Sequence, residues 1–254
     1  SQGSWWESSK KGYCKAAVLY DEIDPSASKP ALSKSYIGYT HRIPEGYTPT
    51  GYWLPFVMNE ESIKNWSLET LECGNRRRRI KKGLKYNEVR CLTKLVDDKE
   101  SFSRILKSTA IRNGHGNPPE HYDLDRESWW ETIKNVSLYT EFWCAFQEGK
   151  MAAYICLHVM GDRVIVDGVK SDTNMLPNCP IDAILYSIMS DLQRREGIRE
   201  MWYGGKSNRS SLDKYKESFG FQVKEIPYIT RLIGGYFPYP KFLEQFVKRN
   251  NNQI

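Results

Sequence analysis

The chain has 254 residues, of which 40% are hydrophobic and 27% are charged, so it suits one sizeable domain or a domain with a smaller extension. This composition excludes a chain that is disordered throughout, and no apolar run approaches the ~18 residues that cross a bilayer. The net charge of +6 is compatible with anionic partners such as phosphates, coenzyme A or RNA.

The first 74 residues are rich in Tyr, Pro, Gly and Ser, and turn signals separate their short apolar runs. Candidate strands lie at residues 15–20, 36–39 and 51–58, and a short helix is expected at residues 62–71. We therefore interpret residues 1–74 as a loop-rich extension that packs on a main domain of residues 75–254.

A strongly basic run follows at residues 76–85, which read RRRRIKKGLK and contain no acid. Ile80 and Leu84 stand four residues apart, which predicts an amphipathic helix. Its cations either bind the phosphates of a donor, such as tRNA or coenzyme A, or form a solvated helix face. Both interpretations remain open, and residues 88–92 are expected to form the next strand.

The middle of the chain alternates clear helix and strand signals. Asp98 is a candidate N-cap for a helix, and a second short helix is expected after Asp125. The apolar face of the first helix would consist of Phe102, Ile105, Leu106, Thr109 and Ala110. Three strands joined by glycine-containing turns are predicted at residues 139–147, 151–160 and 163–170.

A long helix is predicted at residues 181–196, between Pro180 and Gly197, which suit a helix start and stop. A strand at residues 199–203, a helix at 210–218, strands within 221–233 and a terminal helix at 240–248 complete the order. Antiparallel strands that lead into a β–α–β crossover predict an α+β (mixed α/β) fold, with a mostly antiparallel sheet flanked by helices.

From about residue 75 to residue 233, the chain resembles the GNAT-like domain of the FemABX group of acyl- and aminoacyl-transferases. The resemblance rests on residues 76–98, on residues 176–205 (LPNCPIDAILYSIMSDLQRREGIREMWYGG) and on residues 208–221 (NRSSLDKYKESFGF). It implies an N-acyltransferase in which an amine attacks an activated acyl donor, with acyl-CoA ahead of aminoacyl-tRNA. The acceptor would be a small-molecule or peptide amine.

The resemblance also implies which residues contact the donor. These are Val169, Lys170, Ser171, Asn178, Ile181, Tyr203, Gly204 and Asn208. The sequence departs from the usual pattern in the loop at residues 171–180, which has no glycine, whereas a glycine-rich loop lets backbone N–H groups approach a pyrophosphate closely. Pro177 and Pro180 each remove one such N–H group, and Asp182 would repel a phosphate.

Three residues are candidates for proton transfer. The resemblance implies that Tyr215 protonates the leaving thiolate, although Tyr215 also lies on an apolar helix stripe. Asp167 and Glu141 are candidate bases on the predicted central strands, and alternation places Asp167 on one face with Ile165 and Val169. His158, which stands between two apolar residues, is interpreted as a core histidine.

The six cysteines form no CxxC pair, and no histidine stands at the usual ligand spacing beside one, so we expect no metal site. The expected compartment is the cytosol, without a membrane partner. Two other functions remain open: a GNAT-like binding module without catalysis, which the glycine-free loop favours, and an RNA-binding protein that uses the basic run.

Overall fold

The computed structural model describes residues 6–8, 13–16, 22–24, 38–92, 98–114, 139–207 and 209–232. The chain forms two compact units. The smaller unit consists of Ser1–Pro55, Gly205–Arg209 and Val223–Ile254, and the larger unit consists of Phe56–Gly204 and Ser210–Gln222. Residues 56–74, which the sequence analysis assigned to an extension, thus lie in the larger unit, because Phe56, Ile63 and Trp66 are buried in its core.

The smaller unit contains a five-stranded sheet. Its strand order is β1 (Trp6–Ser8), β2 (Tyr13–Ala16), β3 (Gly38–Arg42), β12 (Ile226–Leu232) and β4 (Gly51–Trp53). β12 pairs antiparallel with both β3 and β4, so a late segment of the chain completes the sheet of the first segments. The strand predicted at residues 51–58 is in fact two strands, β4 and β5 (Pro55–Asn59), which belong to different sheets.

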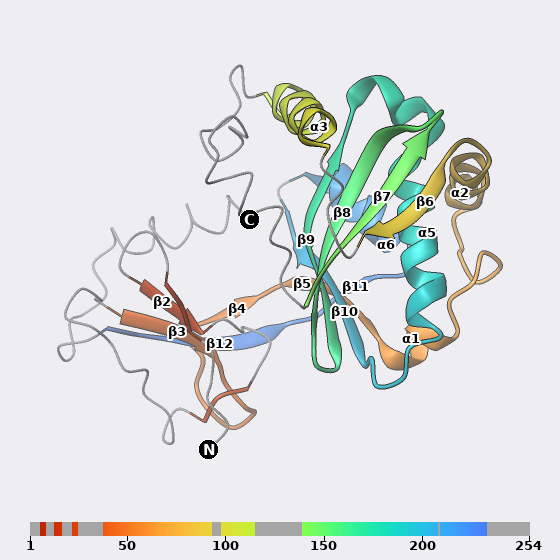
Figure 1. The fold of residues 1–254 in the computed structure, drawn as a ribbon. Coiled ribbons are helices and arrows are strands. Elements are labelled where there is room, and N and C mark those ends of the chain that lie inside the picture. Colours follow the sequence, from red (N-terminus) through yellow and green to blue (C-terminus); the bar gives the residue numbers. More distant parts are fainter. Residues whose placement is uncertain are drawn as a thin grey trace. The chain divides into compact units, whose positions relative to one another are not determined.

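The larger unit is built on a seven-stranded sheet (Figure 1). Its order is β11 (Gln222–Val223), β5, β10 (Glu200–Gly205), β9 (Arg163–Ser171), β8 (Lys150–Met160), β7 (Thr140–Gln147) and β6 (Glu88–Leu92). The strands from β6 to β9 are antiparallel neighbours, and β10 is parallel to β9. The predicted α+β class with a mostly antiparallel sheet is therefore confirmed.

The helices largely agree with the sequence signals. They are α1 (Glu60–Lys64), α2 (Gly74–Tyr86), α3 (Lys99–Arg112), the 3-10 helix η2 (Thr173–Asn178), α5 (Pro180–Leu192) and α6 (Ser210–Glu217). The helix predicted at residues 62–71 is shorter and begins earlier, because the Asn59 side chain accepts a hydrogen bond from the Ser62 N–H and caps it. The helices predicted after Asp125 and at residues 240–248 lie outside the described residues.

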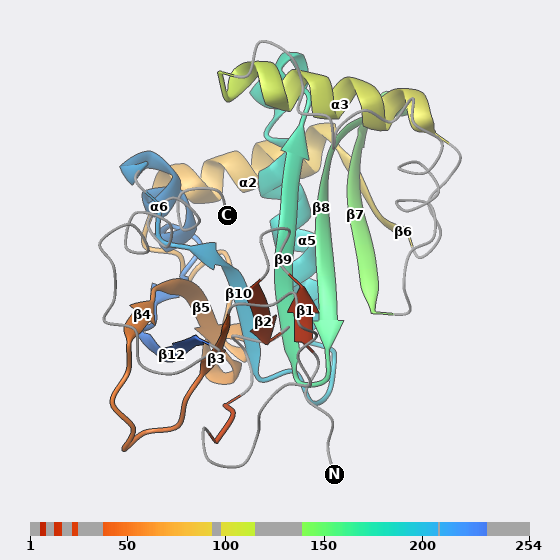
Figure 2. The ribbon, with the colours of Figure 1, turned by 90° about the vertical axis from the view of Figure 1, so that its left-hand side faces the viewer.

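Alternation along β8 directs side chains to two cores on opposite faces of the sheet. Ala153, Ile155 and Leu157 belong to the core that includes the apolar stripe of α5. Tyr154 and Cys156 belong to the core that includes the apolar face predicted for α3. The two helices therefore cover opposite faces, with α3 in front of the sheet and α5 behind it (Figure 2). Among the described residues, no helix has the length and apolar content needed to span a membrane.

Helix α2 packs closely against the first turn of α5 at Gly83. A Cβ atom at this position would lie 2.6 Å from the backbone oxygen of Cys179 and 3.1 Å from Ala183. We expect Gly83→Ala to destabilise the protein by about 1 to 3 kcal/mol, because the clash involves backbone that cannot rotate away. The gain in helix propensity, about 1 kcal/mol, is the smaller effect.

Urea denaturation of Gly83→Ala and of Lys82→Ala, an exposed neighbour on the same helix, would measure this effect. A Gly83→Ala midpoint at or above that of the wild type would contradict the close packing of α2 on α5.

Candidate active site

Strands β9 and β10 separate toward their carboxyl ends (Figure 2). They pair at Arg163–Glu200, Val164–Met201 and Ile165–Trp202, where the parallel ladder ends. β9 continues to Ser171 and β10 continues to Gly205. Ligands of sheets with parallel strands bind beyond the carboxyl ends, where neighbouring strands part, so this is the candidate active site.

A β-bulge lies directly after the last pair of this ladder. Cys156 pairs with Gly168 and Leu157 pairs with Val166, so Asp167 is an extra residue between these two steps. Val164 and Val166 face α5, so alternation places Asp167 on the opposite face, where its carboxylate lies near Cys156 of β8. The bulge reverses the expected alternation beyond Asp167, because Val169 lies opposite Ile155, whose side chain faces α5.

His158 lies beside Asp167 on this face. The distance from His158 Nε2 to Asp167 Oδ2 is 3.7 Å, and His158 Nδ1 lies 3.0 Å from Thr140 Oγ1. The adjacent imidazole holds the pKa of Asp167 below its usual value, against the opposing effect of burial, and the charge of Lys170 acts in the same direction. Asp167 is therefore a carboxylate at neutral pH and a weak proton acceptor.

Glu141, the second predicted base, is not brought to Asp167. It lies opposite Leu157, on the α5 face of the sheet, and both of its oxygens accept hydrogen bonds from Arg195, at 2.6 and 2.9 Å. Burial raises its pKa, but the hydrogen bonds from Arg195 and Trp143 bring the net pKa below the usual value. Glu141 therefore joins β7 to the end of α5 through a charged pair.

The first turn of α5 is occupied by a carboxylate of the chain itself. Asp182 is 1% exposed, and its two oxygens pair with Arg76 and Arg79 of α2. Arg76 is also buried, and it donates a hydrogen bond to Ser218. A carboxylate in the first turn of a helix is stabilised by the helix dipole, and Asp182 adds a negative charge at the helix end where the dipole favours an anion.

The glycine-free loop is held by hydrogen bonds within the chain. The Ser171 N–H donates to Thr109 Oγ1 at 3.1 Å, and Asn178 donates through its side chain to Gln147 at 3.0 Å. Asn87 donates to the Asn178 carbonyl oxygen at 2.8 Å. Ser171 and Asn178, two predicted donor contacts, therefore bind their neighbours in the fold, and Ile181 is buried in the core of α5.

Tyr215 lies with the Asp182 group of residues. Its ring stacks under the Arg76 guanidinium at 4.1 Å, and its hydroxyl oxygen is buried and has no hydrogen-bond partner among the described residues. Burial and the negative charge of Asp182 raise the pKa of Tyr215 well above its usual value. Tyr215 therefore keeps its proton, which suits a hydrogen-bond donor better than a strong acid.

The remaining predicted contacts lie at the end of β10. Tyr203 is buried against Phe221, and Gly204 has a left-handed φ of +61° that favours glycine. The amine of Lys216, on α6, lies 5.6 Å from the centre of the Tyr203 ring, and burial lowers the pKa of this lysine. Lys170 is a residue of β9 and lies opposite Tyr154 of β8. Asn208 lies outside the described residues.

The basic run divides into an inner and an outer group. Arg76 and Arg79 pair with Asp182, whereas the outer cations stand at helical spacing on one exposed face of α2. These outer cations, which we call the α2 basic face, are Arg78, Lys81, Lys82 and Lys85. The inner pair with Asp182 was not among the two interpretations of the run, and the outer cations form the solvated helix face.

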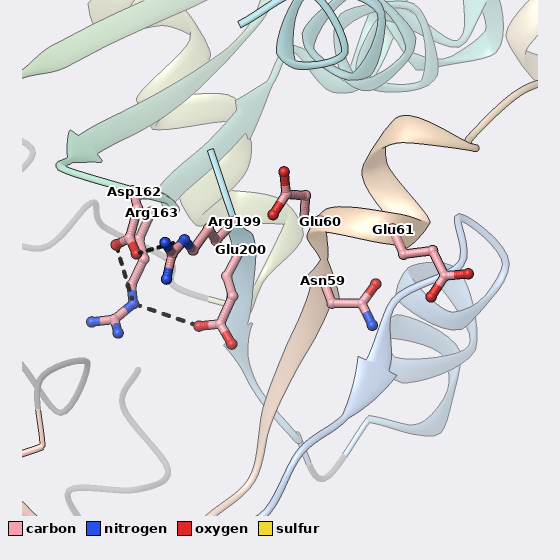
Figure 3. A pocket seen from close by; sticks show the side chains of 7 residues that line it. All are labelled: Asn59, Glu60, Glu61, Asp162, Arg163, Arg199 and Glu200. Carbon is pink, nitrogen blue, oxygen red and sulfur yellow. Dashed lines mark ion pairs between the residues drawn. The ribbon is translucent and has the colours of Figure 1, made fainter. Parts of the chain in front are cut away.

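A pocket lies at the other end of β9 and β10, where the two strands begin (Figure 3). Arg163 lies 3.5 Å from Glu200 and 3.7 Å from Asp162, and Arg199 lies 3.8 Å from Asp162. Glu60 and Glu61 of α1 line the same pocket. Its ion pairs hold the two strand starts together, and it contains none of the predicted site residues.

Two signals in this site were missed from the sequence. His158 was interpreted as a core residue, although strand alternation places it on the same face as Cys156, two residues before it. The pairing of Asp182 with Arg76 joins residues that are far apart in the chain. Two features of the sequence could have predicted this pair: a single acid, Asp182, in the first turn of the apolar helix, and a basic helix that contains no acid.

The sequence matches no protein-family profile and no curated protein sequence. Solved structures do match. L-PGS from Bacillus licheniformis has a TM-score of 0.58 at 9% identity, with 84% of this chain and 72% of that chain covered. FemX has a TM-score of 0.57 at 12% identity, with 82% and 68% covered.

A third similar structure is the C-terminal domain of a protein described as a lysylphosphatidylglycerol synthetase of Agrobacterium fabrum. Its TM-score is 0.53 at 12% identity, with 78% of this chain and 68% of that chain covered. At such identities the likeness concerns the fold. The chain therefore has a GNAT-like fold of the FemABX type, as the resemblance implied.

Proposed function

We propose that the chain transfers an acyl group from an activated donor to an amine, at the place where β9 and β10 separate. The observation that supports this most is the position of the His158–Asp167 pair. Asp167 lies two residues after Ile165, the last residue of β9 that pairs with β10, and its carboxylate lies 3.7 Å from His158 Nε2. A proton acceptor therefore stands beside the strand gap in which GNAT-like folds hold the acyl chain.

In this proposal the amine nitrogen attacks the acyl carbon, a C–N bond forms, and the C–O or C–S bond to the leaving group breaks. His158 accepts the proton that the amine must lose, because Asp167 is too weak a base, and Asp167 stabilises the resulting imidazolium. Tyr215, whose pKa is raised, donates a hydrogen bond to the leaving group or the acyl oxygen.

The position of Asp182 helps to identify the donor. An acyl-CoA bound by its pyrophosphate at the start of α5 would meet a carboxylate that Arg76 and Arg79 already neutralise. This supports a donor that is held elsewhere, and the α2 basic face supports an aminoacyl-tRNA whose backbone phosphates it would contact. Acyl-CoA, which the sequence analysis placed first, is the alternative donor.

A donor panel tests both the reaction and the donor. The purified chain would be incubated with acetyl-CoA, longer acyl-CoAs or charged tRNA, together with a panel of amines, and amide formation would be followed by mass spectrometry. Amide that forms with one donor class and needs the protein supports the proposal. Binding of every donor class without amide formation would contradict catalysis and favour a binding module.

Charge reversal on the α2 basic face separates the two donors. With a tRNA donor, the double variant Lys81→Glu/Lys82→Glu is expected to raise KM at least tenfold and to reduce the salt dependence of binding, because two phosphate contacts are lost. With an acyl-CoA donor, the same variant should change KM less than twofold. Lys214→Glu, an exposed lysine on α6, is the matched control.

A further inference from the structure

Three residues with metal-binding side chains meet on the α3 face of the sheet. Cys156, His158 and Asp167 each offer one ligand atom, and these atoms lie within 4.8 Å of one another. We propose that they bind a divalent cation of the Zn²⁺ class. This inference goes beyond the proposed function, and only its effect on catalysis, described below, rests on that function.

The distances between the ligand atoms of the three side chains fit a small bound ion better than they fit direct hydrogen bonds. Zn²⁺ lies about 2.3 Å from a thiolate sulfur and about 2.0 to 2.2 Å from nitrogen or oxygen, so its tetrahedral ligands stand roughly 3.5 Å apart. The separation of His158 Nε2 from Asp167 Oδ2 is 3.7 Å, which is too long for a hydrogen bond but close to this value. Small rotations of the three side chains would bring their ligand atoms to the distances that a bound Zn²⁺ ion needs.

The surroundings of the three residues are those of a ligand set. Thr140 Oγ1, 3.0 Å from His158 Nδ1, can accept a hydrogen bond from the Nδ1–H group, and in that tautomer Nε2 carries the lone pair that binds a metal. Gly168, directly opposite Cys156, adds no side chain to this part of the sheet.

Thiolate, imidazole and carboxylate ligands together favour Zn²⁺ over Mg²⁺ or Ca²⁺, which prefer oxygen ligands alone. The site is also open on one side: Cys156 is 8% exposed, whereas the side chains of His158 and Asp167 are 32% and 63% exposed. Three protein ligands with solvent on the fourth side form a site of the open type, in which water or a substrate group completes the tetrahedron.

Metal binding and acyl transfer would compete for the same atoms. A bound ion occupies His158 Nε2 and an oxygen of Asp167, which the proposed function uses for the amine proton. Zinc is therefore expected to inhibit acyl transfer, and a chelator is expected to restore it. This consequence holds only if the proposed function is correct, whereas the binding itself is independent of it.

Cobalt titration of the whole, metal-free chain tests the binding directly. Co²⁺ is expected to bind one ion per chain, with a near-ultraviolet band of cobalt–thiolate ligation and visible bands of four-coordinate cobalt, and Zn²⁺ should displace it. Cys156→Ser should remove the thiolate band, and His158→Gln and Asp167→Asn should each weaken binding at least tenfold. Thr140→Val should weaken it about 10- to 100-fold.

Two other cysteines provide controls for the titration. Cys91→Ser changes an exposed thiol and Cys144→Ser changes a buried one, and both variants should keep the cobalt–thiolate band. Circular dichroism would confirm that each variant is folded, and Cys156→Ala serves as a second variant at the ligand position. No thiolate band in the folded wild type, or an unchanged band in Cys156→Ser and Cys156→Ala, would overturn the site.

The zinc sensitivity of catalysis separates this inference from the proposed function. If acyl transfer is found, the ratio of rates without and with zinc should fall at least tenfold in Cys156→Ser. A cobalt–thiolate band in a chain that transfers no acyl group would overturn the proposed function and support the metal site. Acyl transfer by a chain that shows no cobalt–thiolate band would support the proposed function and overturn the metal site.

Discussion

Replacement of His158 by Gln is expected to lower kcat for acyl transfer about 100-fold or more, because general base catalysis contributes about 10²- to 10⁴-fold in enzymes. Asp167→Asn should have a smaller effect in the same direction, because it removes the charge that stabilises the His158 imidazolium but keeps the acceptor nitrogen. Glutamine and asparagine keep the size and the polarity of the replaced side chains, so folding should be preserved.

The rate constants would be measured at saturating amine, so that a change in kcat is separated from a change in KM. Asp162→Asn is the control, because Asp162 lies at the opposite end of β9 and pairs with Arg163 there. If His158→Gln retains the kcat of the wild type while Asp167→Asn loses it, Asp167 itself is the base. If both variants retain it, the amine needs no protein base at this position.

The pair of Asp182 with Arg76 is expected to produce the largest stability effect in the chain. Asp182→Ala should lower the free energy of unfolding by about 3 to 5 kcal/mol, because it leaves the buried Arg76 guanidinium without its carboxylate. In a chain of this size, the melting temperature should fall by roughly 6 to 20 °C. Thermal and urea unfolding would measure both quantities.

The double variant Asp182→Leu/Arg76→Met removes both charges and refills the space with apolar groups. Because a buried ion pair contributes little net stability, this variant should be much closer to the wild type than Asp182→Ala is. Arg78→Ala, on the exposed face of α2, should change stability by less than about 0.5 kcal/mol. An Asp182→Ala variant as stable as Arg78→Ala would contradict the buried pair.

The candidate site has two parts, the end of the β9–β10 ladder and the start of α5. They differ in how well they agree with the resemblance to the FemABX group. The His158–Asp167 pair lies where the β9–β10 ladder ends, which is the place that the proposed function uses. The start of α5 departs from the resemblance, because Asp182 and the hydrogen-bonded loop at residues 171–178 occupy the region of the expected pyrophosphate contacts. The proposed function therefore includes a donor that is held elsewhere than at this helix.

Local sequence patterns predicted the order and type of most elements in the larger unit. The apolar spacing in α3 and α5, the Asp98 cap, and the glycine turns on either side of β8 are local signals, and each acts within a few residues. They were sufficient to predict the three antiparallel strands, the crossover helix and the α+β class.

The partners of the polar residues follow from the tertiary structure and not from local sequence patterns. Asp167 meets His158 and Cys156 because β9 pairs with β8 in the register that sets Ile165 opposite His158, and a register depends on the pairing of two strands. Asp182 meets Arg76 because α2 packs on the first turn of α5, across 106 positions of sequence. Local patterns depend on neighbouring residues, whereas a site and its charges depend on which distant segments pack together.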